Sequence, residues 1–404
     1  MKLGKAVVKS RFVILILAVA LMIPSALGMA FTRVNYDILS YLPDNLDTIK
    51  GQDYLLDDFG KGAFSFLIFE NMDDKDVAAT EEKIKEIDHV DTVLWYDDFA
   101  DISIPKEMLP DKIYDAFNSG NATMMAVFFD TSTSADETMN AIEEIRSVAG
   151  KQCFVSGMSA MITDMKDMFE EQEMTYVAIA VVLAVIAMMI FMDNWIIPFV
   201  FLASIAVAIL VNMGSNYFMG EVSFITKALA AVLQLAVTMD YSIFLWHSYE
   251  EQKGICENHK QAMAVAIHET VRSVIGSSIT TVAGFIALCF MTFALGRDMG
   301  IVMAKGVVIG VLCCVTLLPA LVLTFDRAIE KTTHKPLLPS FDKASAFITK
   351  HYKVWLIIFL VMLFPAIHGN NNLKNYYNID KSLPSTLDSN VANAKLQETF
   401  DMNN

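Results

Sequence analysis

Long apolar segments recur along the chain, and most are close to the length that an α-helix needs to cross a bilayer. Such a helix takes about 20 residues, and the segments near this length are residues 12–31, 175–192, 195–218, 224–246, 274–294, 301–325 and 355–367. The mean hydropathy of +0.44 and the 54% of hydrophobic residues are both too high for an ordinary soluble protein. The pattern therefore predicts a polytopic α-helical membrane protein with seven spans.

The segment between the first two spans, residues 32–172, has instead the pattern of a folded α+β domain, which we call the outer domain. Runs with strand character alternate in it with amphipathic runs, in the order strand, helix, strand, which then occurs a second time. The predicted strands are residues 62–71, 90–98, 121–130 and 151–157, and the predicted helices are residues 74–87 and 134–150. This βαββαβ order predicts a ferredoxin-like domain with two helices on one face of a single sheet.

A helical stretch that follows this domain carries methionines at intervals of three and four residues, namely Met158, Met161, Met165 and Met168. Soft thioethers are suitable ligands for Cu(I). An adaptable apolar face that packs on the sheet or on a neighbouring outer domain explains the same spacing more simply. We therefore predict packing at this helix, and we predict no metal site.

Positive charge near the ends of the spans predicts the orientation. Lys2, Lys5, Lys9 and Arg11 precede the first span, so the N-terminus is expected in the cytoplasm. The first span passes into the outer domain without a clear small-residue cleavage site, which favours a retained anchor over a cleaved signal peptide. The expected order is: 1–31, N-terminus and first span; 32–172, extracytoplasmic porter domain; 173–325, spans two to six; 326–353, basic cytoplasmic linker; 354–369, span seven; 370–404, start of a second porter domain.

Charge and composition exclude several classes of protein. The net charge is −16 and much of the acid lies in the outer domain, so nucleic acid is not an expected partner. Of five cysteines, only Cys153 lies outside the membrane and the cytoplasm in this topology, which rules out an external disulfide within the chain. The chain has no GxxxxGK[ST] loop, metal-ligand spacing or nucleophile elbow, so we expect neither an ATP-driven protein nor an enzyme.

The chain also contains an internal repeat. "NYDILSYLPDNLDT" near Pro43 aligns with "YYNIDKSLPSTLDS" near Pro384 at a shift of 341 residues, which also aligns Pro24 with Pro365. Duplicated membrane units are typical of transporters. The seventh span thus begins a second copy, and the chain is expected to be incomplete. The start of a second outer domain, without its own sheet, is expected to have nothing to bury and to be mobile.

One carboxylate interrupts the apolar residues of the fourth span. Asp240 is expected to be buried. Because a charged side chain at the bilayer centre costs about 2.5 to 3.5 kcal/mol on insertion scales, Asp240 is expected to have a polar partner or a function. At 100° per residue, Gln234, Thr238 and Tyr241 form a polar seam, with Asp240 about 100° from Tyr241. Hydroxyl side chains of the fifth span could support it, namely Ser277, Thr280 and Thr281. The alternative is that Asp240 and Tyr241 only fasten helices together.

Three segments resemble members of the RND superfamily of the MMPL type. "TMDYSIFLWHSYEE" is similar to the family's Asp-Tyr fourth span, "SSITTVAGFIAL" to its fifth and "VTLLPALVL" to the end of its sixth. The resemblance implies a proton-driven exporter of lipids or other hydrophobic compounds in the cell membrane, with Asp240 and Tyr241 as the proton relay and no cofactor. It also implies a second Asp-Tyr pair in a tenth span, which this chain lacks.

The expected partners are therefore membrane lipid and a hydrophobic, lipid-like substrate. Further copies of the same chain, in a homo-oligomer, are a third possible partner. A second reading stays open, because the same fold resembles sterol-sensing and protein-export relatives. In that reading the chain is a membrane sensor or assembly module that transports nothing.

Overall fold

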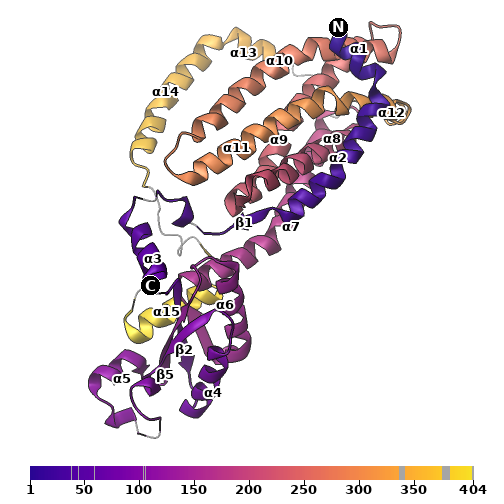
Figure 1. The fold of residues 1–404 in the computed structure, drawn as a ribbon. Helices are drawn as coiled ribbons and strands as arrows, with labels where there is room; N and C mark the ends of the chain where they lie inside the picture. Colours follow the sequence, from indigo (N-terminus) through magenta and orange to yellow (C-terminus); the bar gives the residue numbers. More distant parts are fainter. Residues whose placement is uncertain are drawn as a thin grey trace.

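The computed structural model describes residues 1–37, 39–43, 45–58, 60–102, 104, 106–335, 342–374 and 383–402. A bundle of long helices and a smaller α+β domain lie at opposite ends of the molecule (Figure 1). The N-terminus is at the end of the bundle far from the α+β domain, and the chain ends beside that domain.

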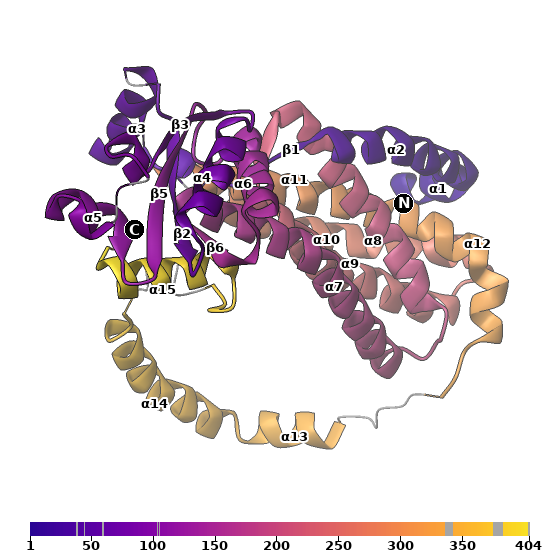
Figure 2. The same ribbon diagram turned by 90° about the horizontal axis from the view of Figure 1, so that it is seen from below.

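Seven helices of the described chain are long and apolar enough to cross a membrane, and they lie where the sequence predicts spans. The seven spans are formed by α2 (Arg11–Phe31), α7 (Met158–Phe191), α8 (Ile197–Gly214), α9 (Phe224–Lys253), α10 (His259–Leu288), α11 (Ala294–Val315) together with α12 (Leu317–Lys331), and α14 (Tyr352–Asn371). The short helix α1 (Lys2–Lys9) precedes them, and α13 (Asp342–Lys350) leads into α14. None of the α14 residues is buried, and this helix lies at the edge of the molecule (Figure 2).

Three spans differ most from their predicted bounds. The methionine stretch and the second span form one continuous helix, α7, and α10 begins at His259 rather than at residue 274. The sixth span is divided at Thr316 into α11 and α12. Pro319 explains this break, because it lacks an N–H and, in an unbroken helix, its ring would clash with the carbonyl group of Val315, four residues earlier.

The outer domain contains every strand and helix predicted for it, with somewhat shorter bounds. They are β2 (Ala63–Glu70), α4 (Asp74–Lys85), β3 (Val90–Leu94), β5 (Ala122–Phe129), α6 (Asp136–Ala149) and β6 (Cys153–Ser156). The strand order is β3-β5-β2-β6 and all these pairs are antiparallel. Val77, Ile84 and Ile142 of the two helices pack on Leu67 and Phe69, which point to one face of the sheet.

The remaining elements are short. They are β1 (Arg33–Asn35), α3 (Asp47–Asp57), α5 (Asp111–Phe117), β4 (Asn118–Ser119), β7 (Glu221–Ser223), α15 (Asp388–Phe400) and the 3₁₀ turns Leu39–Tyr41, Tyr96–Asp98, Lys106–Met108, Gly150–Gln152 and Ser215–Met219. β1 and β7 pair in parallel and join the outer domain to the bundle.

The second face of the sheet is covered by α15, which belongs to the start of the second repeat. Ala392 and Leu396 of this helix are fully buried, and Leu396 packs on Ile68 and Met124. Lys395 Nζ also lies 2.6 Å from both carboxylate oxygens of Glu70. The expectation that this segment has nothing to bury is therefore wrong, because it packs on the sheet of the first repeat.

The structure agrees with the internal repeat. Helix α3 begins at Asp47 and α15 at Asp388, and these residues are related by the shift found in the sequence. Helices α2 and α14, of 21 and 20 residues, are related in the same way, and each contains its proline, Pro24 or Pro365.

Candidate functional site

The helix that carries the candidate relay residues, α9, is fixed by hydrogen bonds at its N-terminal end. The Ser223 hydroxyl group caps the helix by accepting a bond from the Ile225 N–H at 3.2 Å. Asp298, at the start of α11, accepts bonds from the Ser223 N–H at 2.9 Å and from the Thr226 hydroxyl group at 2.6 Å. Lys227, the next residue after Thr226, forms an ion pair of 3.0 Å with Glu173 of α7.

One face of α9 forms a buried polar contact with α8 and α11. Gln234 is 3% exposed, and its side-chain oxygen accepts a bond of 2.9 Å from the Asn212 amide group. Its side-chain nitrogen donates to the Gly306 carbonyl oxygen at 3.2 Å. A Cβ atom at Gly310 would lie 2.5 Å from Thr238 Oγ1. The two glycines therefore allow α11 to approach the polar face of α9 closely.

Asp240 and Tyr241 point in different directions from this contact and from each other. Tyr241 is 5% exposed and packs in the main core of the bundle with Leu245 and Leu318. Asp240 is exposed, and within the described chain its carboxylate makes no hydrogen bond or ion pair. The expectation that Asp240 is buried is thus wrong for this chain, because no described helix covers its side of α9.

Asp240 belongs to an exposed stripe along α9, which we call the open stripe. Its members recur at three and four residues, so they lie on one face of the helix. They are Leu229, Leu233, Ala236, Asp240, Phe244 and His247. Leu229, Leu233 and Phe244 are 41%, 37% and 62% exposed. A single carboxylate therefore lies within an otherwise largely apolar surface.

The hydroxyl groups predicted to support Asp240 bond within their own helix. Ser277 donates to the Val274 carbonyl oxygen at 3.1 Å, and Thr280 and Thr281 both donate to the Ser277 carbonyl oxygen. Ser277 and Thr280 are exposed on α10. Of the predicted supporting residues, the structure places Gln234 and Thr238 at the contact with α11 and leaves the three α10 residues away from it.

Sequence reasoning did not identify two polar residues of the bundle. Asn212 was missed because a single asparagine in an apolar run gives little signal, although it is fully buried against Gln234. Lys305 lies inside the sixth span, and its Nζ donates to Asn216 Oδ1 at 2.5 Å. A lysine within a span is a signal that could have been used, because intramembrane charges are rare and usually have a function.

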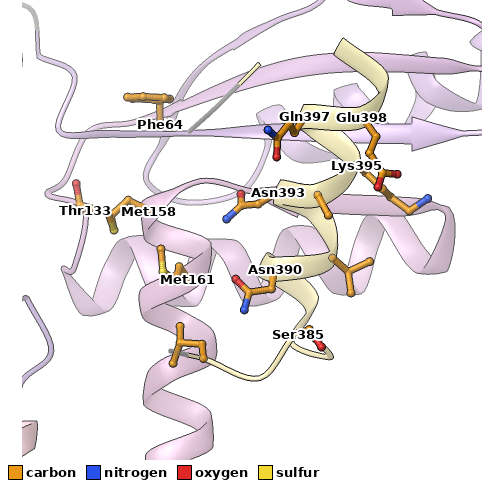
Figure 3. Close-up of a pocket in the computed structure, with 13 residues that line it drawn as sticks. Phe64, Thr133, Met158, Met161, Ser385, Asn390, Asn393, Lys395, Gln397 and Glu398 are labelled. Atoms are coloured by element: carbon orange, nitrogen blue, oxygen red, sulfur yellow. The ribbon is translucent and has the colours of Figure 1, made fainter. Parts of the chain in front are cut away.

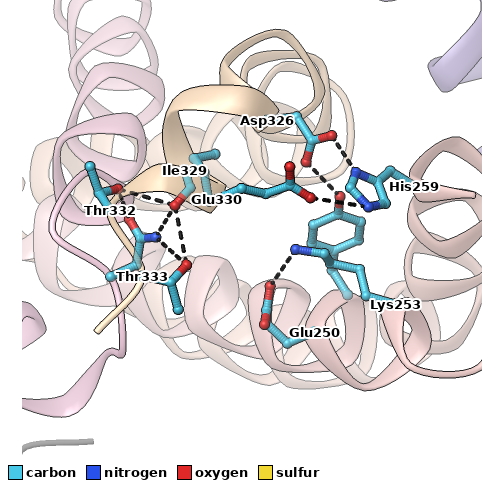
Figure 4. A network of polar contacts seen from close by, with 10 residues as sticks. Glu250, Lys253, His259, Asp326, Ile329, Glu330, Thr332 and Thr333 are labelled. Atoms are coloured by element: carbon cyan, nitrogen blue, oxygen red, sulfur yellow. Dashed lines mark hydrogen bonds and ion pairs between the residues drawn. The ribbon is translucent and has the colours of Figure 1, made fainter. Parts of the chain in front are cut away.

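A second polar network closes the end of the bundle far from the outer domain (Figure 4). The His259 ring lies between Asp326 at Nδ1 and Glu330 at Nε2, and the second contact is 3.4 Å. Tyr249 donates to the other Asp326 oxygen at 3.2 Å. A ring with a carboxylate at each nitrogen can donate to both only as the cation. The network joins the end of α9 to α10 and α12.

The outer domain has a groove beside α15 with a volume of about 840 Å³. Figure 3 shows Met158 and Met161 of α7 on one side and Asn390 and Asn393 of α15 on the other. Met165, one turn further along α7, is 3% exposed and packs with Met139 and Phe224. This contact agrees with the packing interpretation of the methionine helix.

Comparison with known proteins gives a consistent result. The model of the MMPL family matches residues 107–355. The siderophore exporter MmpL5 of Mycobacterium tuberculosis (strain CDC 1551 / Oshkosh) is 22% identical over 66% of this chain. The probable transport proteins MmpL12 of the same strain and MmpL9 of strain ATCC 25618 / H37Rv are 23% and 26% identical over 76% and 48% of the chain. The matches cover only 28%, 27% and 21% of these relatives, so the chain spans less than a third of their length.

Proposed function

Because the chain belongs to the MMPL family, we propose that it forms the first repeat of a proton-driven secondary transporter that exports lipids or other hydrophobic compounds. The relatives named as transporters or exporters support transport in general. In this proposal the N-terminus is cytoplasmic, the outer domain is extracytoplasmic, and the protein resides in the cell membrane.

The observation that carries the proposal is the position of Asp240 on the open stripe. An ionised carboxylate facing lipid costs about 2.5 to 3.5 kcal/mol on insertion scales, so this face favours either a protonated Asp240 or a polar partner. The membrane helices of a second repeat would cover the stripe and supply such a partner. A carboxylate at a helix interface that gains and loses a proton can bias how the two repeats pack, which is what proton-coupled transport requires.

Tyr241 has a different part in this proposal. It is anchored in the apolar core beside Leu245, so it positions the turn of α9 that bears Asp240. The contact of Gln234 with Asn212 and Gly306 holds α9 against α8 and α11. A change in the charge of Asp240 would therefore be transmitted to these three helices together.

We further propose that the outer domain is a ferredoxin-like porter domain through which the substrate passes. The antiparallel order β3-β5-β2-β6, with α4 and α6 on one face, supports this assignment. The groove beside α15 has methionine and leucine side chains for an apolar substrate and amide groups for its polar part. Leu55 of α3, the repeat counterpart of Leu396, is 48% exposed, and a second outer domain would provide a sheet to bury it.

The substitution Asp240→Asn in the full-length gene product tests the function. The amide keeps the shape of the side chain and cannot carry the proton, so export of a lipophilic dye from cells should fall to the level seen with an uncoupler. General acid–base groups contribute about 10²- to 10⁴-fold to proton-transfer steps, so the loss should be easy to measure. Asp88→Asn is the matched control, because Asp88 is exposed in the outer domain.

A second measurement does not need the substrate. A hydrophobic carbodiimide reacts with carboxyl groups that face lipid, so mass spectrometry should find Asp240 modified and the control residue Asp88 unmodified. Export by Asp240→Asn at the rate of the unmodified protein would refute the relay. It would leave the sensor or assembly module as the better reading.

A further inference from the structure

Helix α1 is held tightly at the end of the bundle far from the outer domain. A Cβ atom at Gly4 would lie 2.3 Å from the Ala264 carbonyl oxygen of α10, so the two backbones are in direct contact. Val7, on the same side of α1, is 5% exposed. Lys2, Lys5 and Lys9 therefore lie on the exposed side of a helix whose position is fixed.

Four cationic side chains converge on a hollow between α1, the first turn of α2 and the start of α10. The hollow has a volume of about 700 Å³ and is lined by Lys5, Lys9, Arg11 and Lys260, together with Gln261. None of the described residues that line it carries a carboxylate. In a chain with a net charge of −16, this is a local concentration of positive charge.

These cations lack counter-ions within the described part of the chain. Lys5, Lys9 and Lys260 have no carboxylate oxygen within the 4.0 Å of an ion pair there. Arg11 donates to the Leu323 carbonyl oxygen at 3.2 Å, and its guanidinium group lies 4.7 Å from the centre of the Phe12 ring. Lys5 and Lys9 are four residues apart on one helix, where like charges repel. A bound anion would relieve this repulsion.

The hollow lies where a membrane surface is expected. Arg11 is the first residue of the first span, and Phe12, Val13 and Ile16 directly after it are 59%, 66% and 70% exposed. A ligand in the hollow thus meets cations at one end and an apolar surface at the other. Basic pockets at the cytoplasmic ends of membrane helices are suited to the headgroups of anionic lipids.

We propose that this hollow binds the phosphate headgroup of an anionic phospholipid, with the acyl chains lying along the exposed apolar side of α2. The assignment of the lipid to the cytoplasmic leaflet rests on the orientation given in the proposed function. The binding itself does not, since it depends only on the side chains around the hollow. The lipid would fasten α1 and the start of α10 to the membrane surface.

The test is lipid binding by the purified chain in detergent, measured by native mass spectrometry with phosphatidylglycerol and phosphatidylcholine. The unmodified chain should prefer phosphatidylglycerol. A variant with Lys5→Gln, Lys9→Gln and Lys260→Gln should bind phosphatidylglycerol roughly 100-fold more weakly. The loss of each basic side chain near an anionic membrane surface weakens binding by roughly fivefold, and three such losses multiply. Arginine at the same three positions should restore the preference.

The matched control removes three other cations, with Lys343→Gln, Lys350→Gln and Lys353→Gln. These lysines are exposed in and beside α13, so the loss of net charge is the same while the hollow is unchanged. Equal phosphatidylglycerol binding by the two triple variants would overturn the site, and so would equal binding of the two lipids by the unmodified chain.

Inorganic phosphate separates the lipid from a soluble ligand. Phosphate that displaced phosphatidylglycerol and bound equally well alone would contradict the role of the apolar surface and identify a soluble phosphate compound instead. Because this assay involves neither transport nor a proton gradient, its failure would leave the proposed function untouched. The export assay on Asp240→Asn is likewise independent of lipid binding in the hollow.

Discussion

The substitution Leu396→Ala should release α15 from the outer domain. Leu396 is fully buried against Ile68 and Met124, and truncation of a fully buried leucine costs about 2 to 5 kcal/mol through lost transfer energy and the cavity left behind. The ion pair of Lys395 with Glu70 cannot replace that contribution. Both side chains are 27% exposed, and pairs near the surface contribute at most about 1 kcal/mol.

Hydrogen exchange of the α15 amides in the complete chain, followed by mass spectrometry, measures this loss. Since about 1.4 kcal/mol corresponds to a factor of ten, the exchange should become at least roughly 30-fold faster in the variant, while the amides of α9 remain unchanged. Gln397→Ala is the control, because Gln397 is exposed on the same helix. The reasoning is refuted if α15 of the unmodified chain already exchanges like an unstructured peptide, or if Leu396→Ala has no effect.

Three further predictions concern packing and charge. Gly310→Val should reduce the yield of folded monomer in size-exclusion chromatography, because its side chain would collide with Thr238; normal yield would contradict the close contact of α9 with α11. The isolated outer domain, residues 32–172, should be soluble with an α+β circular dichroism spectrum, and fusion to α15 should raise its melting temperature; no increase would count against the covered sheet face. Burial raises the pKa of Glu81 from 4.5 to about 7, although Lys85 opposes the shift. Between pH 4.5 and about 7, Glu81 is protonated in the folded domain and ionised in the unfolded chain. The melting temperature of the domain should therefore fall as the pH rises through this range. The same fall in Glu81→Gln would refute the assignment to Glu81.

Much of the architecture follows from local pattern. The seven spans are visible because about 20 consecutive apolar residues have few other stable environments. The strands and helices of the outer domain follow from periodicities of two and 3.6 residues, and the repeat follows from a single ungapped shift that the paired helices α3 and α15 obey. The bounds were less predictable, since polar turns of α7 and α10 continue helices beyond their apolar parts.

The sequence pattern determined only part of the candidate site. Helical geometry places Asp240 about 100° from Tyr241, so their side chains had to point to different sides of α9. Which side is covered depends on α8, α11 and α12, which come from other parts of the chain, and these helices cover Tyr241 and leave Asp240 open. The partner of Gln234 is an asparagine in the preceding span, and a composition pattern does not specify such a pairing.

The sequence by itself determined the membrane class, the outer α+β domain, the duplication and the presence of a carboxylate in the fourth span, because each depends on neighbours along the chain. Only the tertiary structure decided that α15 covers the sheet of the first repeat and that Asp240 lies on an open face. It also decided that lysines from α1 and α10 meet around one hollow. These features depend on contacts between residues up to several hundred positions apart, and their energies arise only when the helices pack.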